Sequence, residues 1–104
     1  LLFAVRGDTR LRLDPALGFD FYATDLVLQA QEAGLTSVVV DAYCEHWSDT
    51  PVEGKVPATL ARRIAASGAL FEAKWKHRLP VSTPCFDIAR PGDVQACADA
   101  LAKA

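Results

Sequence analysis

The chain has 104 residues, which is enough for one domain with a modest hydrophobic core. Hydrophobic residues make up 51% and charged residues 23%, a globular balance that excludes an intrinsically disordered chain. The 11 Lys and Arg residues against 13 Asp and Glu residues leave a net charge of -2, which argues against nucleic acid as the main partner.

Hydropathy and cysteine usage indicate the compartment. No apolar run reaches the roughly 20 residues of a membrane helix. Three cysteines (Cys44, Cys85 and Cys97) without a C-x-x-C pair do not form a disulfide framework or a four-thiolate zinc site. We therefore expect reduced thiols and a cytoplasmic protein. The chain contains no Met, and we therefore interpret it as a piece of a longer gene product or as a processed one.

The N-terminal part of the chain predicts two strands, a helix and a third strand. Residues 1–6 form an apolar run, and residues 11–13 alternate as a returning strand does. Thr24 is a suitable N-cap for a helix over residues 25–33, and Gly34 suits the left-handed position that ends it. The β-branched run of residues 35–40 predicts a strand buried on both faces, continuing toward His46.

The C-terminal part predicts helices separated by loops. Residues 47–56 have loop composition, and a helix follows over residues 57–77 with an interruption near Ser67-Gly68. Residues 82–91 are expected to be irregular, and a terminal amphipathic helix occupies residues 91–104. Phe71, Leu70 and Trp75 are expected to pack on the strand that carries Val38 and Val40. Lys74, Lys76 and Arg78 are expected to be exposed.

This order of elements (strand, strand, helix, strand, helix, helix) predicts one α/β domain spanning residues 1–104. A sheet of so few strands leaves one face or edge uncovered. We therefore expect that another segment completes the sheet, or that copies of the chain associate through an exposed sheet edge.

The densest group of candidate functional residues lies where an aromatic segment enters the first helix. Asp20, Tyr22, Thr24 and Asp25 surround this junction, and ligands bind at such junctions in open α/β sheets. Asp25 could accept a proton from a substrate hydroxyl. Capping of the helix would by itself also explain an acidic residue in the first turn.

Two further groups could carry chemistry. His46, beyond the predicted strand, could be a metal ligand or a base, or an ordinary loop histidine. Cys44 lies two residues away, but a Cys–His pair without an orienting third group is a weak nucleophile. The basic residues near His77 could face a phosphate or an acidic lipid, although solvated helix ends commonly have this composition.

Several segments together resemble the C-terminal half of a GT-A type, family-2-like bacterial glycosyltransferase domain. They are the run of residues 19–30 with the sequence FDFYATDLVLQA, then Gly34, the predicted strand of residues 36–40, and His46 with Ser48. The later FEAKW at residues 71–75 and LPVSTP at residues 79–84 resemble the tail of bacterial members. The resemblance covers about residues 1–85.

The resemblance implies a mixed sheet flanked by helices that transfers a sugar from a nucleotide-sugar to an acceptor hydroxyl with inversion. It assigns Asp25 as the general base and offers Asp20, Tyr22 and Thr24 as substrate-binding residues. It also offers His46 as a ligand of a divalent cation, Mn²⁺ or Mg²⁺. The acceptor would be a glycan or a lipid-linked substrate.

The Asp-x-Asp metal motif of that family does not occur in this sequence. We therefore expect the nucleotide-binding half to lie upstream, and the chain on its own to be inactive. One alternative is a non-catalytic binding or regulatory domain with the same half-fold. A second is a small hydrolase that uses Cys44 or His46.

Overall fold

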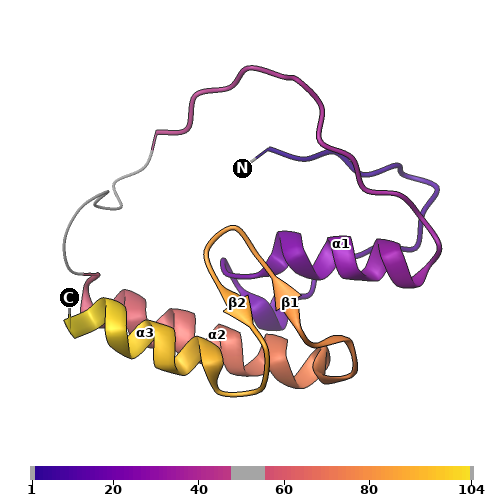
Figure 1. The fold of residues 1–104 in the computed structure, drawn as a ribbon. Coiled ribbons are helices and arrows are strands. Elements are labelled where there is room, and N and C mark those ends of the chain that lie inside the picture. The colour runs from indigo at the N-terminus through magenta and orange to yellow at the C-terminus, as the bar shows by residue number, and fades with distance from the viewer. Residues whose placement is uncertain (1, 48–55, 104) are drawn as a thin grey trace.

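The computed structural model describes residues 2–47 and 56–103. Its elements in chain order are η1 (Pro15–Leu17), α1 (Tyr22–Glu32), α2 (Ala58–Lys74), η2 (Lys76–Arg78), β1 (Val81–Ser82), β2 (Asp87–Ile88) and α3 (Asp93–Lys103). Helices α2 and α3 lie side by side, and the β1–β2 hairpin crosses between them and α1 (Figure 1). Helices combined with a small sheet are compatible with the predicted α/β class only at this coarse level.

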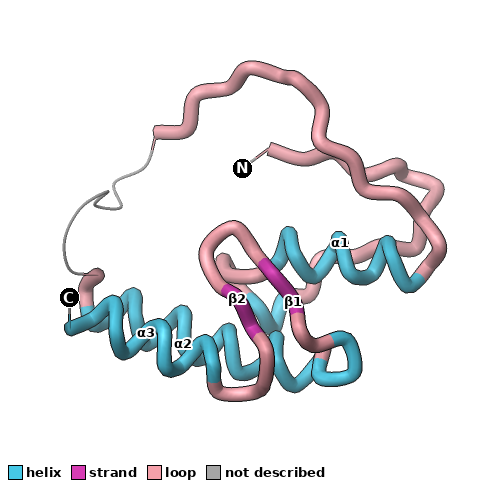
Figure 2. The backbone as a smooth tube through the Cα atoms, viewed as in Figure 1, coloured by secondary structure: helices cyan, strands magenta, loops and turns pink. Residues whose placement is uncertain are grey.

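The sheet is smaller than predicted and lies elsewhere. It is a two-stranded antiparallel pair in which Val81 faces Ile88 and Ser82 faces Asp87. This hairpin falls partly in the region expected to be irregular. The strands predicted at residues 1–6, 11–13 and 35–40 are not strands in the described part of the chain, which there follows an irregular course (Figure 2). β-Branched composition favours a strand, but a strand exists only where a neighbouring segment pairs with its backbone.

Helix α1 confirms the first predicted helix and starts three residues earlier than expected. Its N-cap is Phe21 rather than Thr24, with a left-handed φ of 64° and no side-chain cap bond. This conformation costs about 1–2 kcal/mol for a residue other than glycine. The ring of Phe21 stacks on Phe71 with centroids 5.1 Å apart and lies 5.7 Å from Phe86, and this packing offsets the strain.

The predicted glycine stop at the end of α1 is confirmed. Gly34 has a φ of 72°, and its N–H donates to the carbonyl of Gln31 at 3.1 Å. The N–H of Leu35 reaches back to the carbonyl of Ala30 at 2.8 Å. These two bonds form a Schellman motif and satisfy carbonyls that the helix end would otherwise leave unpaired.

Helix α2 runs through Ser67 and Gly68 without the predicted interruption. Both residues are buried because α3 packs closely against this part of the helix. A Cβ atom on Gly68 would come within 2.2 Å of a Val94 methyl group. Glycine is therefore present here for close helix packing and not as a helix breaker.

Helix α3 confirms the predicted terminal helix and is capped by a side chain of α2. Glu72 is buried and accepts hydrogen bonds from the backbone N–H groups of Gly92 at 2.8 Å and Val94 at 2.9 Å. A carboxylate at a helix N-terminus satisfies free N–H donors and interacts favourably with the helix dipole.

The hydrophobic core lies where the helices and the hairpin meet. Its buried members are Leu17, Leu28, Phe71, Trp75, Ile88 and Val94. Phe71 and Trp75 are buried as predicted, but against η1, α1, the hairpin and α3 rather than a strand at residues 35–40. Leu70, predicted to be partly buried on that strand, is half exposed, and residues 38 and 40 form no strand for it to pack on.

The segment of residues 35–47 forms a long arc away from the helices (Figure 1). Val38, Val39 and Val40 are exposed in it, so the prediction of a strand buried on both faces is wrong for this structure. The predicted loop at residues 47–56 lies almost entirely outside the described residues.

Candidate functional site

The carboxylate of Asp25 joins α1 to the end of α2. Its Oδ1 accepts hydrogen bonds from the indole Nε1 of Trp75 at 2.8 Å and from Nζ of Lys74 at 2.7 Å. Its Oδ2 accepts one from the Gln29 amide at 2.6 Å. The side chain is 0% exposed, so Asp25 lies in the first helical turn as expected, but its carboxylate does not face an open cleft.

A second layer of contacts extends from this carboxylate. The amide of Gln29 donates to the carbonyl of Arg12 at 2.9 Å and accepts from the N–H of Arg12 at 3.3 Å. Lys74 also donates to the carboxylate of Asp14 at 2.8 Å. The segment that precedes η1 is therefore bound near Asp25 at two points, at Arg12 by Gln29 and at Asp14 by Lys74.

Lys74 stands between two carboxylates. Partial burial acts to lower the pKa of its ammonium group, but the hydrogen bonds and charges of Asp14 and Asp25 outweigh burial, so the pKa is raised. The hydrogen bond from Lys74, together with one from the backbone N–H of Ala16, lowers the pKa of Asp14. Lys74 is exposed as predicted, but its ammonium group is a permanent cation bound by two carboxylates.

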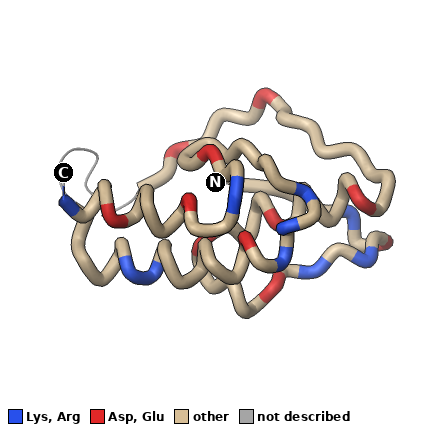
Figure 3. Tube along the Cα trace, turned by 60° about the horizontal axis from the view of Figure 1, so that its bottom comes forward, with Lys and Arg blue, Asp and Glu red and all other residues tan. Residues whose placement is uncertain are grey.

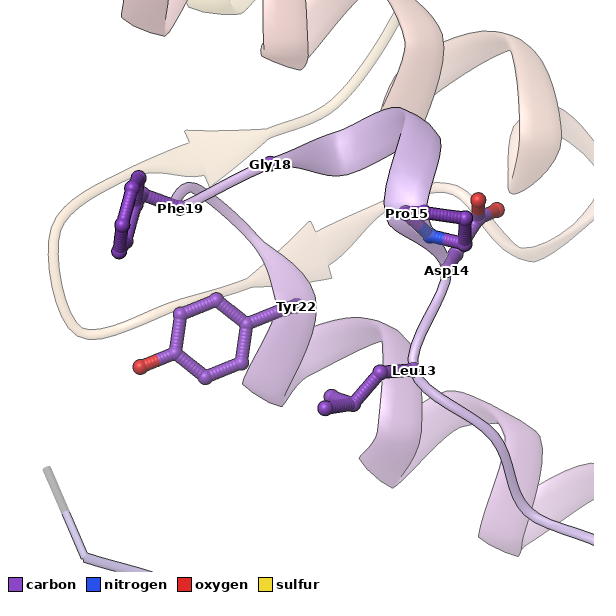
Figure 4. Close-up of a pocket in the computed structure, with 6 residues that line it drawn as sticks. All are labelled: Leu13, Asp14, Pro15, Gly18, Phe19 and Tyr22. Carbon is purple, nitrogen blue, oxygen red and sulfur yellow. The ribbon is translucent and has the colours of Figure 1, made fainter.

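The other predicted substrate-binding residues lie around the same end of α1. Asp20 is held by the guanidinium of Arg63, with bonds of 3.0 and 3.3 Å, and by the hydroxyl of Ser67 at 3.4 Å. The Asp20 interaction raises the pKa of Arg63. Tyr22 lines a surface hollow beside Asp14 (Figure 4). Thr24 is half-buried within the first turn and does not cap the helix.

His46 lies apart from this group, in the exposed segment of residues 35–47. Within the two described ranges, no three His, Cys, Asp or Glu side chains are placed to hold a metal ion. His46 is thus a single candidate ligand, and the described residues do not fit a divalent-cation site around it. Cys44 is a free thiol on the same exposed segment.

Two basic residues of η2, which follows α2, contact α1. His77 is bonded to Glu32 at 2.6 Å, and Arg78 donates to Gln31 at 2.9 Å. Acidic and basic residues are interspersed over the helices rather than separated onto two faces (Figure 3). The interpretation as a solvated basic helix end is therefore wrong in part, because two of these residues bind the end of α1.

Sequence reasoning missed the partners of Asp25. Trp75 had a signal, because its helical spacing predicted burial, and a buried indole N–H needs an acceptor. Gln29 also had a local signal, because it lies four residues after Asp25 on the same helix face. Lys74 and its second partner Asp14 had none, since their contacts depend on how α1, α2 and the N-terminal segment pack.

No protein-family model, curated protein or solved structure matches this chain. Among the described residues, no helix combines the length and the apolar composition needed to cross a membrane.

Proposed function

We propose that this chain is the C-terminal, acceptor-side part of an inverting glycosyltransferase with a GT-A-like fold, and that Asp25 is its general base. In this proposal a nucleotide-binding half, outside the chain, binds the sugar donor. Asp25 takes the proton from the acceptor hydroxyl as that oxygen attacks the anomeric carbon and the nucleoside diphosphate departs.

The observation that supports the proposal best is the contact between two distant parts of the resemblance. Asp25 comes from the aromatic segment that enters the first helix, and Lys74 and Trp75 come from the Phe-x-x-Lys-Trp tail. The indole and the ammonium group both bind Oδ1 of Asp25. Because Lys74 and Trp75 both bind this carboxylate, the second segment holds the Asp25 side chain in one orientation.

The hydrogen-bond geometry leaves capacity for a substrate. A carboxylate has about four accepting positions, two on each oxygen. Oδ1 accepts two bonds and Oδ2 accepts one, from Gln29. One accepting position on Oδ2 remains for an acceptor hydroxyl. Because Asp25 is buried, the hydroxyl reaches it only when the segment around Arg12, which Gln29 binds, moves away.

The divalent cation that the resemblance implies enters no step of this proposal. His46 is its one candidate ligand here, and further ligands would have to come from the donor-binding half.

The test is sugar transfer by the complete protein with Asp25→Asn. Loss of a general base lowers turnover by about 10²–10⁴-fold. Glu32→Gln, which alters an exposed carboxylate of the same helix, is the matched control and should leave turnover unchanged. Because Asp25 is buried, Trp75→Phe serves as a second control that weakens the same network but keeps the carboxylate.

The two variants could also lose turnover equally, each in proportion to its loss of folded protein. That result would exclude Asp25 as the general base. The burial of Asp25 favours one other candidate function, a non-catalytic binding or regulatory domain in which this carboxylate only joins helices. That candidate is supported if Asp25→Asn unfolds the chain and no sugar transfer is found in the complete protein.

A further inference from the structure

A surface hollow lies beside the start of α1 and close to Asp25. It has a volume of about 410 Å³ and lies between η1, its flanking residues and the first turn of α1 (Figure 4). Volumes of roughly 300–1,000 Å³ are typical of small-molecule sites. The hollow is lined by Leu13, Asp14, Pro15, Gly18, Phe19 and Tyr22.

Two aromatic rings stand at one end of this hollow. Phe19 is 81% exposed, although it is a large apolar residue. Tyr22 is half-buried, and its hydroxyl points away from the other lining side chains (Figure 4). The guanidinium of Arg63 lies 5.9 Å from the Phe19 ring centroid. The Tyr22 ring also packs on Phe3, with centroids 6.1 Å apart, so Phe19 provides most of the exposed aromatic surface beside the hollow. Exposed aromatic surface next to a concavity is typical of a ligand contact.

The other end of the hollow is connected to the proposed base. Asp14 lines the hollow, and its carboxylate accepts from Lys74 at 2.8 Å. The same ammonium group lies 2.7 Å from Oδ1 of Asp25. One lysine therefore separates the hollow from the carboxylate that would receive the acceptor proton.

We propose that this hollow is a subsite for one sugar ring of the acceptor, with Phe19 and Tyr22 as its binding platform. The proposal rests on the proposed function. A sugar ring has a face of C–H groups that packs on aromatic rings, and an edge of hydroxyl groups that can bond to the Tyr22 hydroxyl. The mixture of apolar walls and few polar groups suits this amphipathic ligand.

The experiment is saturation-transfer NMR on the protein with the methyl glycosides of glucose, galactose, mannose and N-acetylglucosamine, each tested separately. We expect ring C–H protons of at least one glycoside to receive saturation, and Phe19→Ala to reduce that signal to baseline. Phe19→Ala should fold normally, because the ring is mostly exposed. The matched control is Tyr43→Ala, which removes an 88% exposed aromatic ring outside the hollow and should leave the signal unchanged.

Octyl glucoside separates a sugar site from an alkyl site. Saturation of the octyl protons alone, sensitive to Phe19→Ala, would overturn the sugar proposal and indicate a lipid chain in the hollow. Ring signals that Phe19→Ala leaves unchanged, or no ring signal from any glycoside, would also overturn it.

The two proposals fail separately. If sugar transfer by the complete protein depends on Asp25 and Phe19→Ala changes neither binding nor the KM for the acceptor, this subsite is wrong and the enzyme assignment stands. If Phe19→Ala abolishes glycoside binding but the complete protein transfers no sugar, the subsite stands and the enzyme assignment is wrong.

Discussion

A single buried carboxylate organises contacts from three parts of the chain. Burial of a charged group is costly unless it is paired and hydrogen-bonded, and Asp25 has both a cation and two neutral donors. No buried side-chain nitrogen or oxygen lacks a partner in residues 2–47 and 56–103. The helix pair α1–α2 therefore depends on polar contacts as well as on apolar packing.

Trp75→Phe removes the indole N–H and, in a core side chain that is 3% exposed, also removes buried ring volume. Trp75→Phe keeps an aromatic ring but leaves Asp25 without one of its donors. We expect the free energy of unfolding to fall by about 1.5–3 kcal/mol for the lost hydrogen bond to a charged group, and further for the cavity left in the core. Urea denaturation measures this loss. Trp47→Phe, at an exposed tryptophan, is the control, and equal stability of both variants would contradict the buried hydrogen bond.

Acid should weaken the start of α3. Asp93 accepts hydrogen bonds from the backbone N–H groups of Arg90 at 3.0 Å and Ala89 at 2.9 Å, which lower its pKa. A lowered folded-state pKa means that this stabilisation is complete above the unfolded value of about 3.9 and is lost as the pH falls through the folded value.

Melting temperatures measured from about pH 6 down to about pH 3 should therefore fall for the parent protein. Asp93→Asn should be less stable near neutral pH and show a shallower decline. An identical decline in both proteins would exclude Asp93 as a source of the acid sensitivity.

At the scale of elements, α2 and α3 form the tightest pair. Gly68 allows the close approach, and Val94, which is fully buried, fills the space. The same helix supplies Glu72, which caps α3. Side-chain packing and capping thus fix where α3 starts along α2.

Gly68→Ala should destabilise the chain although alanine is the better helix former. The gain in helix propensity is about 1 kcal/mol. The added methyl group must displace Val94, and overpacking of this kind costs about 1–3 kcal/mol. We expect a net loss of stability in thermal or urea unfolding.

A Val94→Ala background offers a check on that mechanism, because the displaced methyl groups are then absent. The extra cost of Gly68→Ala should be smaller in this background. Stabilisation by Gly68→Ala in the parent would show that the helices are not packed this closely.

At the scale of the whole molecule, the helical part and the arc of residues 35–47 differ in character. The radius of gyration is 14.7 Å, against about 13 Å for a compact chain of this length. Val39 is fully exposed, with an exposed fraction of 101%, and its neighbours Val38 and Val40 are also exposed. This arc has the composition of an inner strand, but no strand within residues 2–47 and 56–103 lies beside it.

We expect the chain on its own to self-associate through this apolar arc rather than through an edge of the small β1–β2 sheet. Exposed apolar segments with unpaired backbone groups favour pairing between chains. Size-exclusion chromatography with light scattering should show concentration-dependent oligomers. Val39→Lys should shift the population toward monomer, whereas Leu70→Lys, at an exposed leucine of α2, should not. A monomer at high concentration would contradict the expectation.

The sequence by itself determined the three helices and the end of α1. Apolar residues at helical spacing and a glycine stop are local signals, and local backbone bonds form wherever those signals occur. Burial of Phe71 and Trp75 also followed from spacing, because both lie on one face of the same helix. The importance of Asp25 was indicated by its place in the first turn and by the resemblance, and its catalytic role stays a prediction.

Only the tertiary structure decided which strands form and what surrounds Asp25. Residues 35–40 have strong strand composition, but a strand requires a partner, and no described segment pairs with them. The donors to Asp25 include Lys74 and Trp75, about fifty positions along the chain, so no local pattern connects them to it. Helix packing brings these groups together, and the same packing buries the carboxylate that the resemblance assigns as a general base.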